Sequence, residues 1–362
     1  MRPAFATIRH AAAFTLLLLV LIAAPAVTAR FGLLDRAQVY ETMPAGTGPV
    51  RHIQQQIFER SEDLDMVFVG SSLMWSAIDA PYVQQALSSA LGRPASVEVL
   101  ASVWPGLDRD YAFLRDLLAH RRVGLAVIQL PHRNRPTRDF AAEINRVSDQ
   151  PHVQAFRFYR VGEFDEVLDG LSQRNRLALY AGAVLGLPRH LLTKLRPNYL
   201  SPSPVEETLG ARFQREGFYG AAFEPFRPEP PVIPADEMIY SADGAQSYRF
   251  FDEPLPPYQH HFARLIAELL SENDVPAVLL HIPQANEIDA GFVEERENWP
   301  ATTGIKATMV GVPPARMFQA FSADETERFF LNDHLNENGA IYFTKFVMPA
   351  LLRTYQDLAQ TD

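Results

Sequence analysis

The segment Met66-Val-Phe-Val-Gly70-Ser71-Ser72-Leu73 decides the fold, because a short apolar run stops at a glycine and two serines. Runs that are apolar throughout are typical of strands covered on both faces. In an α/β sheet, ligands bind at the C-terminal ends of the strands, and a small residue there lets the chain turn sharply and expose a hydroxyl. We therefore expect a strand of a parallel sheet at residues 66–70 and a reactive serine directly after it.

Segments typical of strands and helices alternate along the rest of the chain. Before residue 131 the pattern predicts helices at 80–91 and 108–120, the second with Asp108 as its N-cap, and strands at 96–101 and 123–130. Towards the C-terminus it predicts a helix around the apolar stripe at 262–270, strands at 275–283 and 307–311, and a closing helix at 339–358. This alternation predicts a three-layer α/β/α sandwich with a mainly parallel sheet.

The chain between about residues 132 and 257 breaks the alternation. A helical stretch around 162–195 is followed by a proline-rich segment, and a structureless loop of this length is unusual in a compact domain. We therefore expect an insertion that packs over the strand ends as a lid or a substrate-binding wall. The α/β domain then covers residues 61–358, and residues 31–60 form a linker.

The N-terminus carries two arginines ahead of an apolar run at residues 11–29. The run is about one bilayer crossing long, but Pro25 shortens its strongly apolar part to the length of a signal-peptide core, and small residues at its end fit a cleavage site. A cleaved signal peptide and a retained membrane anchor in residues 1–30 both stay open, beside the plainer interpretation of a core helix. Either export interpretation places residues 31–362 in the periplasm or another extracytoplasmic space, tethered to the inner membrane if uncleaved.

Composition removes several functional classes. The 362 residues carry a formal net charge of −10 and no lysine- or arginine-rich run, so nucleic acid is not expected as a partner. The chain has no cysteine, which excludes disulfides, thiolate metal sites and cysteine nucleophiles. The adjacent His260 and His261 lack the spacing of metal ligands, and we expect neither a metal nor a cofactor.

A second polar segment, Asn332-Asp333-His334-Leu335-Asn336-Glu337-Asn338-Gly339-Ala340, opens the closing helix. A histidine on a loop is free to reach a serine hydroxyl as general base, and a nearby carboxylate can fix its tautomer. Each segment alone has a plain interpretation, a common turn for the first and a helix-capping loop for the second. Their joint occurrence at the two ends of an α/β pattern favours Ser72 as nucleophile and His334 as base.

These two segments resemble the first and last motif blocks of the SGNH (GDSL-like) hydrolase superfamily. The chain is most similar to the exported branch that includes the alginate O-acetylation and D-alanyl-lipoteichoic-acid proteins, and the order of elements fits over about residues 60–355. On this resemblance Ser72 takes the position of the nucleophile and His334 that of the base. Ser71 stands where the family often has Asp.

The other members of the site carry alternatives. The resemblance implies an oxyanion hole made by the serine amide, a glycine and an asparagine, whose nearest counterparts are Gly106 after the second strand and Asn134 after the third. The family's acid commonly stands three residues before the histidine, where this chain has Leu331. We expect Asp333 to serve if the loop turns tightly, because adjacent residues on an extended loop point in opposite directions. Asp324 or another acid, or a Ser-His dyad, are the alternatives.

Three side chains near the motif segments are candidates for substrate binding. Trp75 and Trp104 could stack on a sugar ring, with packing at the sheet edge as the alternative. Arg133 follows the third strand and could contact an anionic glycan, with a solvated loop as the alternative. His281 lies within an apolar strand and is interpreted as a core histidine.

The resemblance implies acyl transfer, usually of acetyl, to a cell-surface or secreted polysaccharide, with a multi-spanning membrane protein as the acyl donor. Ser72 would attack an ester carbonyl, and His334 would take and return the proton. One alternative is a carbohydrate esterase or deacetylase. The other is a non-catalytic glycan-binding or assembly subunit that keeps the fold with a disabled site.

Overall fold

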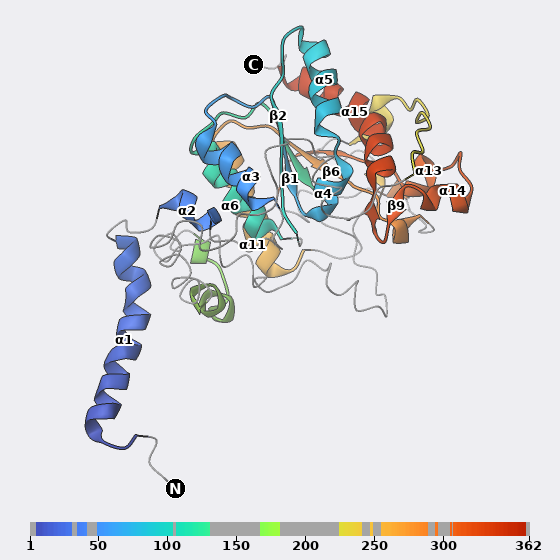
Figure 1. Ribbon diagram of the computed structural model, residues 1–362. Coiled ribbons are helices and arrows are strands. Elements are labelled where there is room, and N and C mark those ends of the chain that lie inside the picture. Colours follow the sequence, from blue (N-terminus) through green and yellow to red (C-terminus); the bar gives the residue numbers. More distant parts are fainter. Residues whose placement is uncertain are drawn as a thin grey trace. The chain divides into compact units, whose positions relative to one another are not determined.

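The architecture is that of a computed structural model (Figure 1). The structure describes residues 5–30, 35–41, 49–103, 106–130, 167–181, 224–240, 247–248, 255–288, 294–295, 305 and 307–359. The chain divides into two compact units, one of residues 1–44 and 150–201 and one of residues 45–149 and 202–362. The second unit contains the sheet and both motif segments.

The first unit contains α1 (Ile8–Arg30) and α2 (Arg36–Glu41). Large apolar side chains of α1 between Phe14 and Ile22 are exposed, and the Tyr180 hydroxyl donates to the Ile22 carbonyl at 2.9 Å. Of the helical stretch expected around 162–195, residues 167–168 and 173–181 are helical, and most of the remainder lies outside the described residues. No helix in the described part of the chain combines the length and apolar character needed to cross a bilayer.

A six-stranded sheet forms the centre of the second unit, in the order β2-β1-β3-β6-β8-β4. Its strands are β1 (Met66–Gly70), β2 (Val97–Ala101), β3 (Ala126–Gln129), β4 (Ile239–Tyr240), β6 (Ala277–Leu280) and β8 (Thr308–Val310). Every neighbouring pair is parallel except β8 with β4. The prediction of an α/β domain with a mainly parallel sheet is confirmed.

Local signals explain why the central elements form where they do. All five residues of β1 are buried, as a strand covered on both faces requires. The helix α5 (Ala80–Leu91) has Pro81 in its first turn, where the missing N–H is harmless, and ends at Gly92 with a φ of 66°. That left-handed conformation suits glycine and stops the helix. The predicted bounds of β1 and α5 are confirmed.

The larger helices of this unit form two groups, and within each group one helix contacts the other members. The first comprises α4 (Ser72–Ala77), α5 and α15 (Glu337–Ala359), and the second comprises α6 (Leu107–Leu118), α11 (Pro257–Glu272) and the π-helical turn η2 (Gln55–Glu59) (Figure 1). The arrangement is consistent with a three-layer sandwich. The shorter elements are α3 (Val50–Gln54), η4 (Ala235–Glu237), β5 (Ser247–Tyr248), η5 (Ala285–Glu287), β7 (Glu294–Glu295), α13 (Pro314–Met317), α14 (Ala323–Glu327), β9 (Phe330–Leu331) and β10 (His334–Leu335).

The start of α6 differs from the prediction. Gly106 is the N-cap, and no side chain caps this helix. The expected cap, Asp108, is buried in the first turn, where its carboxylate accepts hydrogen bonds from the Arg109 N–H at 2.9 Å and from the Tyr258 hydroxyl at 2.9 Å. The prediction of Asp108 as N-cap was wrong because α11 supplies a buried partner that draws this carboxylate into the core.

The described part of the expected insertion contributes to the sheet itself. Residues 239–240 form β4, which pairs antiparallel with β8 at the edge. Upstream, the Phe226 N–H donates to Asn338 Oδ1 at 3.1 Å, and Arg227 pairs with Glu337 at 3.2 Å, so this segment also packs on the start of α15. The predicted lid over the strand ends falls mostly on residues outside the described ranges.

Candidate active site

Ser72 is the first residue of α4 and directly follows the turn that ends β1. Its side chain is nearly buried, at 8% exposure, and its Oγ lies 2.9 Å from Nε2 of His334. The two residues are 262 positions apart in the chain. The fold therefore brings the predicted nucleophile and the predicted base into hydrogen-bonding distance at the C-terminal edge of the parallel strands.

The turn before Ser72 is fixed by Gln129, the last residue of β3. Gln129 Oε1 accepts hydrogen bonds from the Ser71 N–H at 2.8 Å and from the Ser71 hydroxyl at 2.9 Å. A Cβ on Gly70 would lie 2.6 Å from the same oxygen, so glycine is what lets the buried amide reach the turn. Ser71 also caps α4, accepting from the Leu73 N–H at 3.3 Å. Ser71 is thus engaged in shaping the main chain around Ser72.

Gln129 did not emerge from the sequence analysis as a site residue. The one available signal is that a polar amide ends an otherwise apolar strand, Ala126–Gln129. A buried polar group in such a place needs a partner. That signal cannot name the partner, because it becomes visible only once β3 is known to lie beside β1.

His334 lies on a short strand and not on an open loop as predicted. The strands β9 and β10 form an antiparallel hairpin in which His334 pairs with Leu331, leaving Asn332 and Asp333 as its two-residue turn. Asn332 has a φ of 54°, in the left-handed region that tight hairpin turns use and asparagine tolerates. The tight turn required for Asp333 to act is therefore present, and its role as the triad acid stays a prediction.

The hairpin is tied to the start of α15 by Asn336. Its Nδ2 donates to the carbonyls of Arg328 at 2.9 Å and Phe330 at 3.2 Å, and its Oδ1 accepts from the Gly339 N–H at 3.1 Å. A Cβ on Gly339 would collide with the Phe329 carbonyl oxygen. The asparagine and glycine of the C-terminal motif therefore set the position of His334 relative to the last helix.

Burial controls the protonation of His334. Desolvation lowers the pKa of His334 to about 4, because an imidazolium loses hydration in the protein interior. The ring is therefore neutral at neutral pH, the form in which Nε2 can accept the proton of the Ser72 hydroxyl when Nδ1 carries the ring proton.

The candidates for the oxyanion hole are only partly within the described residues. In that part of the chain, the main-chain N–H of Ser72 has no hydrogen-bond acceptor. Gly106 follows β2 at the same sheet edge, where the Ser102 N–H donates to the Gly70 carbonyl at 3.2 Å. A Cβ on Gly106 would collide with Asp108 Oδ1, so packing already requires glycine there. Its role as an oxyanion donor stays a prediction, and Asn134 lies outside the described residues.

Of the three candidates for substrate binding, only Trp75 lies within the described residues. Trp75 is 5% exposed and belongs to the hydrophobic core, so it packs as the alternative interpretation had it and presents no open face to a sugar. Trp104 and Arg133 lie outside the described residues. His281 is buried as expected, with Nε2 3.4 Å from Glu287 Oε2. Asp324, the alternative acid, lies in the first turn of α14.

Two comparisons with known proteins assign no family to the chain. A scan against protein-family models found no match. A search of curated proteins found none either. Function is therefore inferred from the motif residues and from the geometry of the Ser72–His334 pair.

Proposed function

We propose that the protein is an exported serine acyltransferase with an SGNH-like domain, which transfers an acyl group, most simply acetyl, to a cell-surface or secreted polysaccharide. One observation carries the proposal, the 2.9 Å separation of Ser72 Oγ and His334 Nε2 at the strand ends of a parallel sheet. A neutral imidazole in contact with a serine hydroxyl is the arrangement that activates serine as a nucleophile.

The proposed acyl transfer proceeds in two half-reactions, through an acyl ester on Ser72. Ser72 Oγ attacks the carbonyl carbon of the donor ester while His334 Nε2 takes the hydroxyl proton. The tetrahedral intermediate collapses as the donor alcohol leaves with that proton, and an acyl-serine ester remains. A sugar hydroxyl then attacks the acyl carbonyl, again giving its proton to His334, and the new ester leaves as the proton returns to Ser72. We assign to the Ser72 N–H the stabilisation of both oxyanions.

Two further observations support the export and transfer parts of the proposal. The helix α1 carries exposed apolar side chains over Phe14 to Ile22, as expected of an N-terminal signal segment. The nucleophile is only 8% exposed, which limits access of bulk water to an acyl-enzyme. The acyl donor would be a multi-spanning membrane protein.

Reactivity of the serine is the first test. A fluorophosphonate probe should label the wild-type chain and fail to label Ser72→Ala, and His334→Gln should slow labelling by about 10²-fold or more, the usual contribution of a general base. Ser76→Ala is the matched control, because Ser76 lies on the same helix and its hydroxyl donates to the Leu73 carbonyl at 3.1 Å. An unlabelled wild-type chain would favour the non-catalytic subunit.

Transfer is separated from hydrolysis in a second step. A chromogenic acetyl ester is offered with and without oligosaccharide, and the acetyl group is followed by mass spectrometry. Acetylated sugar that depends on Ser72 supports the transferase. Acetate as the sole product, at a rate that oligosaccharide does not change, supports the esterase alternative.

A further inference from the structure

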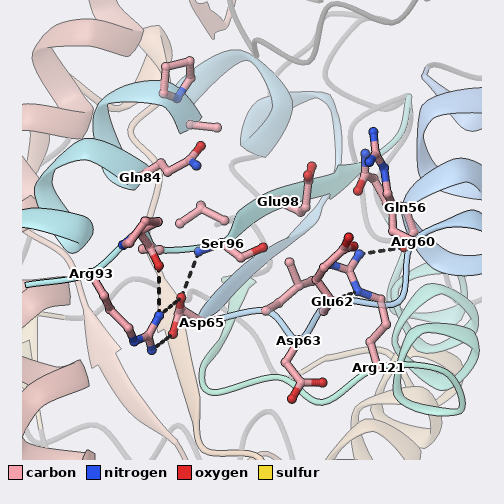
Figure 2. Close-up of a pocket in the computed structure, with 16 residues that line it drawn as sticks. Gln56, Arg60, Glu62, Asp63, Asp65, Gln84, Arg93, Ser96, Glu98 and Arg121 are labelled. Atoms are coloured by element: carbon pink, nitrogen blue, oxygen red, sulfur yellow. Dashed lines mark hydrogen bonds and ion pairs between the residues drawn. The ribbon is translucent and has the colours of Figure 1, made fainter. Parts of the chain in front are cut away.

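A cavity of ≈ 780 Å³ lies at the end of the sheet opposite to Ser72 (Figure 2). It is lined by Ser96 and the first two residues of β2, by Gln84 of α5 and by Gln56 of η2. Asp65, which precedes β1, also lines it, whereas Ser72 follows the end of this five-residue strand, about 17 Å further along. The volume falls in the range of small-ligand sites, about 300–1,000 Å³.

One wall of the cavity is a fixed ion pair. Arg93 donates to both carboxylate oxygens of Asp65, at 3.0 and 2.5 Å, and Figure 2 shows the two side chains facing each other. Asp65 also accepts from the Ser96 N–H at 2.8 Å and from the Tyr355 hydroxyl at 3.2 Å. These contacts hold donors and acceptors in place before any ligand arrives, which lowers the entropic cost of binding.

A second cation is built into the wall near η2. Arg121 is 5% exposed and donates to the main-chain carbonyls of Glu62 and of Gln56, the latter at 2.7 Å. Desolvation lowers its pKa, opposed by the charges of Glu98 and Glu62. Glu98 in turn lies 3.2 Å from His52 Nε2. Charges of both signs are therefore interspersed along this wall.

Two side chains remain available to a ligand. Arg60 and Gln84 lie on opposite sides of the cavity in Figure 2, and both are exposed. The lining contains no aromatic ring that could stack on a base. Within the described ranges, no group of three or more histidine and acidic side chains is arranged to hold a metal ion.

We infer that this cavity binds a neutral carbohydrate, as a second site remote from Ser72. A ligand with a net charge of either sign would meet like charges on the same wall. A sugar hydroxyl both donates and accepts, so it can bridge an arginine N–H and a carboxylate oxygen that lie side by side. The inference concerns binding alone and holds whether or not Ser72 transfers acyl groups.

The experiment uses the full chain with Ser72→Ala throughout, so that acyl transfer cannot contribute. Saturation-transfer NMR is recorded with neutral glucose, mannose and N-acetylglucosamine oligomers and with charged oligogalacturonate. We expect binding of at least one neutral oligomer, weakened about tenfold or more by Arg60→Ala with Gln84→Ala, since two hydrogen-bonding groups are lost. Both positions are exposed, so the fold should be retained.

The matched control is Gln85→Ala with Arg264→Ala. Both residues are exposed, and neither they nor Glu268, the ion-pair partner of Arg264, line the cavity. The control should bind like the parent chain. The inference is overturned if no neutral oligomer receives saturation, if the double variant and the control lose binding equally, or if oligogalacturonate binds more tightly than every neutral oligomer.

Discussion

The low pKa of His334 predicts how the reactivity of Ser72 depends on pH. Burial takes this pKa from 6.5 to about 4, so the neutral imidazole persists well into acid. At pH 5.5 about nine-tenths or more of the ring is neutral, against about one tenth for a histidine of ordinary pKa. The rate of fluorophosphonate labelling at Ser72 should therefore stay nearly constant from pH 8 to pH 5 and fall to half near pH 4.

The assay measures initial labelling rates between pH 3.5 and 8, with circular dichroism at each pH to show that the chain is folded. A half-maximal rate near pH 6.5 would refute the reasoning, because it would mean that the imidazole is solvated or held charged by a carboxylate. Asp333→Asn distinguishes these outcomes. If Asp333 contributes its charge to the ring, this variant lowers the midpoint, and if solvent is responsible, the midpoint does not move.

The lowered pKa of His334 also makes the free energy of unfolding depend on pH. Above pH 6.5 the ring is neutral in the folded and unfolded chains, so it contributes no pH dependence. Between pH 6.5 and 4 the unfolded chain takes up a proton that the folded chain does not, so stability falls by up to about 3 kcal/mol. His334→Gln should lack this loss, and the difference in unfolding free energy between the two chains at pH 7 and pH 4.5 measures it.

Three further predictions concern the groups around the site. Gln129→Leu removes the acceptor of the buried Ser71 N–H, so it should lower the free energy of unfolding, measured in urea, by about 1–3 kcal/mol and slow probe labelling. Ser71→Ala keeps that N–H bond and should lower the free energy of unfolding by less. Gly339→Ala places a methyl group against a main-chain oxygen that cannot give way, and should destabilise the chain by about 1–3 kcal/mol in the same assay; an unchanged midpoint would contradict this. Desolvation raises the pKa of Asp110 to about 7, and the charge of Arg109 opposes this shift. The folded chain therefore binds this proton more tightly than the unfolded chain does. The resulting contribution to the free energy of unfolding is present at low pH and is lost as pH rises through 7. Asp110→Asn should abolish this loss, so its stability relative to wild type should grow between pH 5 and pH 8.

The central part of the fold was predictable because its signals are local. β1 is apolar along its whole length, and α5 is bounded by a proline and a glycine whose conformational limits act within one turn. The Ser72–His334 pair followed from two motif segments, each at an element boundary. What these segments have in common is that a few neighbouring residues determine the backbone.

The features that escaped prediction depend on tertiary pairing. β4 and the two strands of the β9–β10 hairpin have two residues each, too few to show any alternation of apolar and polar side chains. Asp108 has the chemistry of an N-cap, and only the approach of Tyr258 from a helix 150 positions away diverts it. Gln129 likewise gains its role only because a strand distant in sequence lies beside it.

The span of the Ser72–His334 contact has a consequence for a chain made from its N-terminus to its C-terminus. Ser72 and the sheet around it are synthesised early, whereas the hairpin that carries His334 and the helix that anchors it comprise the last thirty or so residues. A single domain generally folds as a unit. Until the last of these residues are made, Ser72 therefore lacks His334 at its side, and with it the group that we propose as its base.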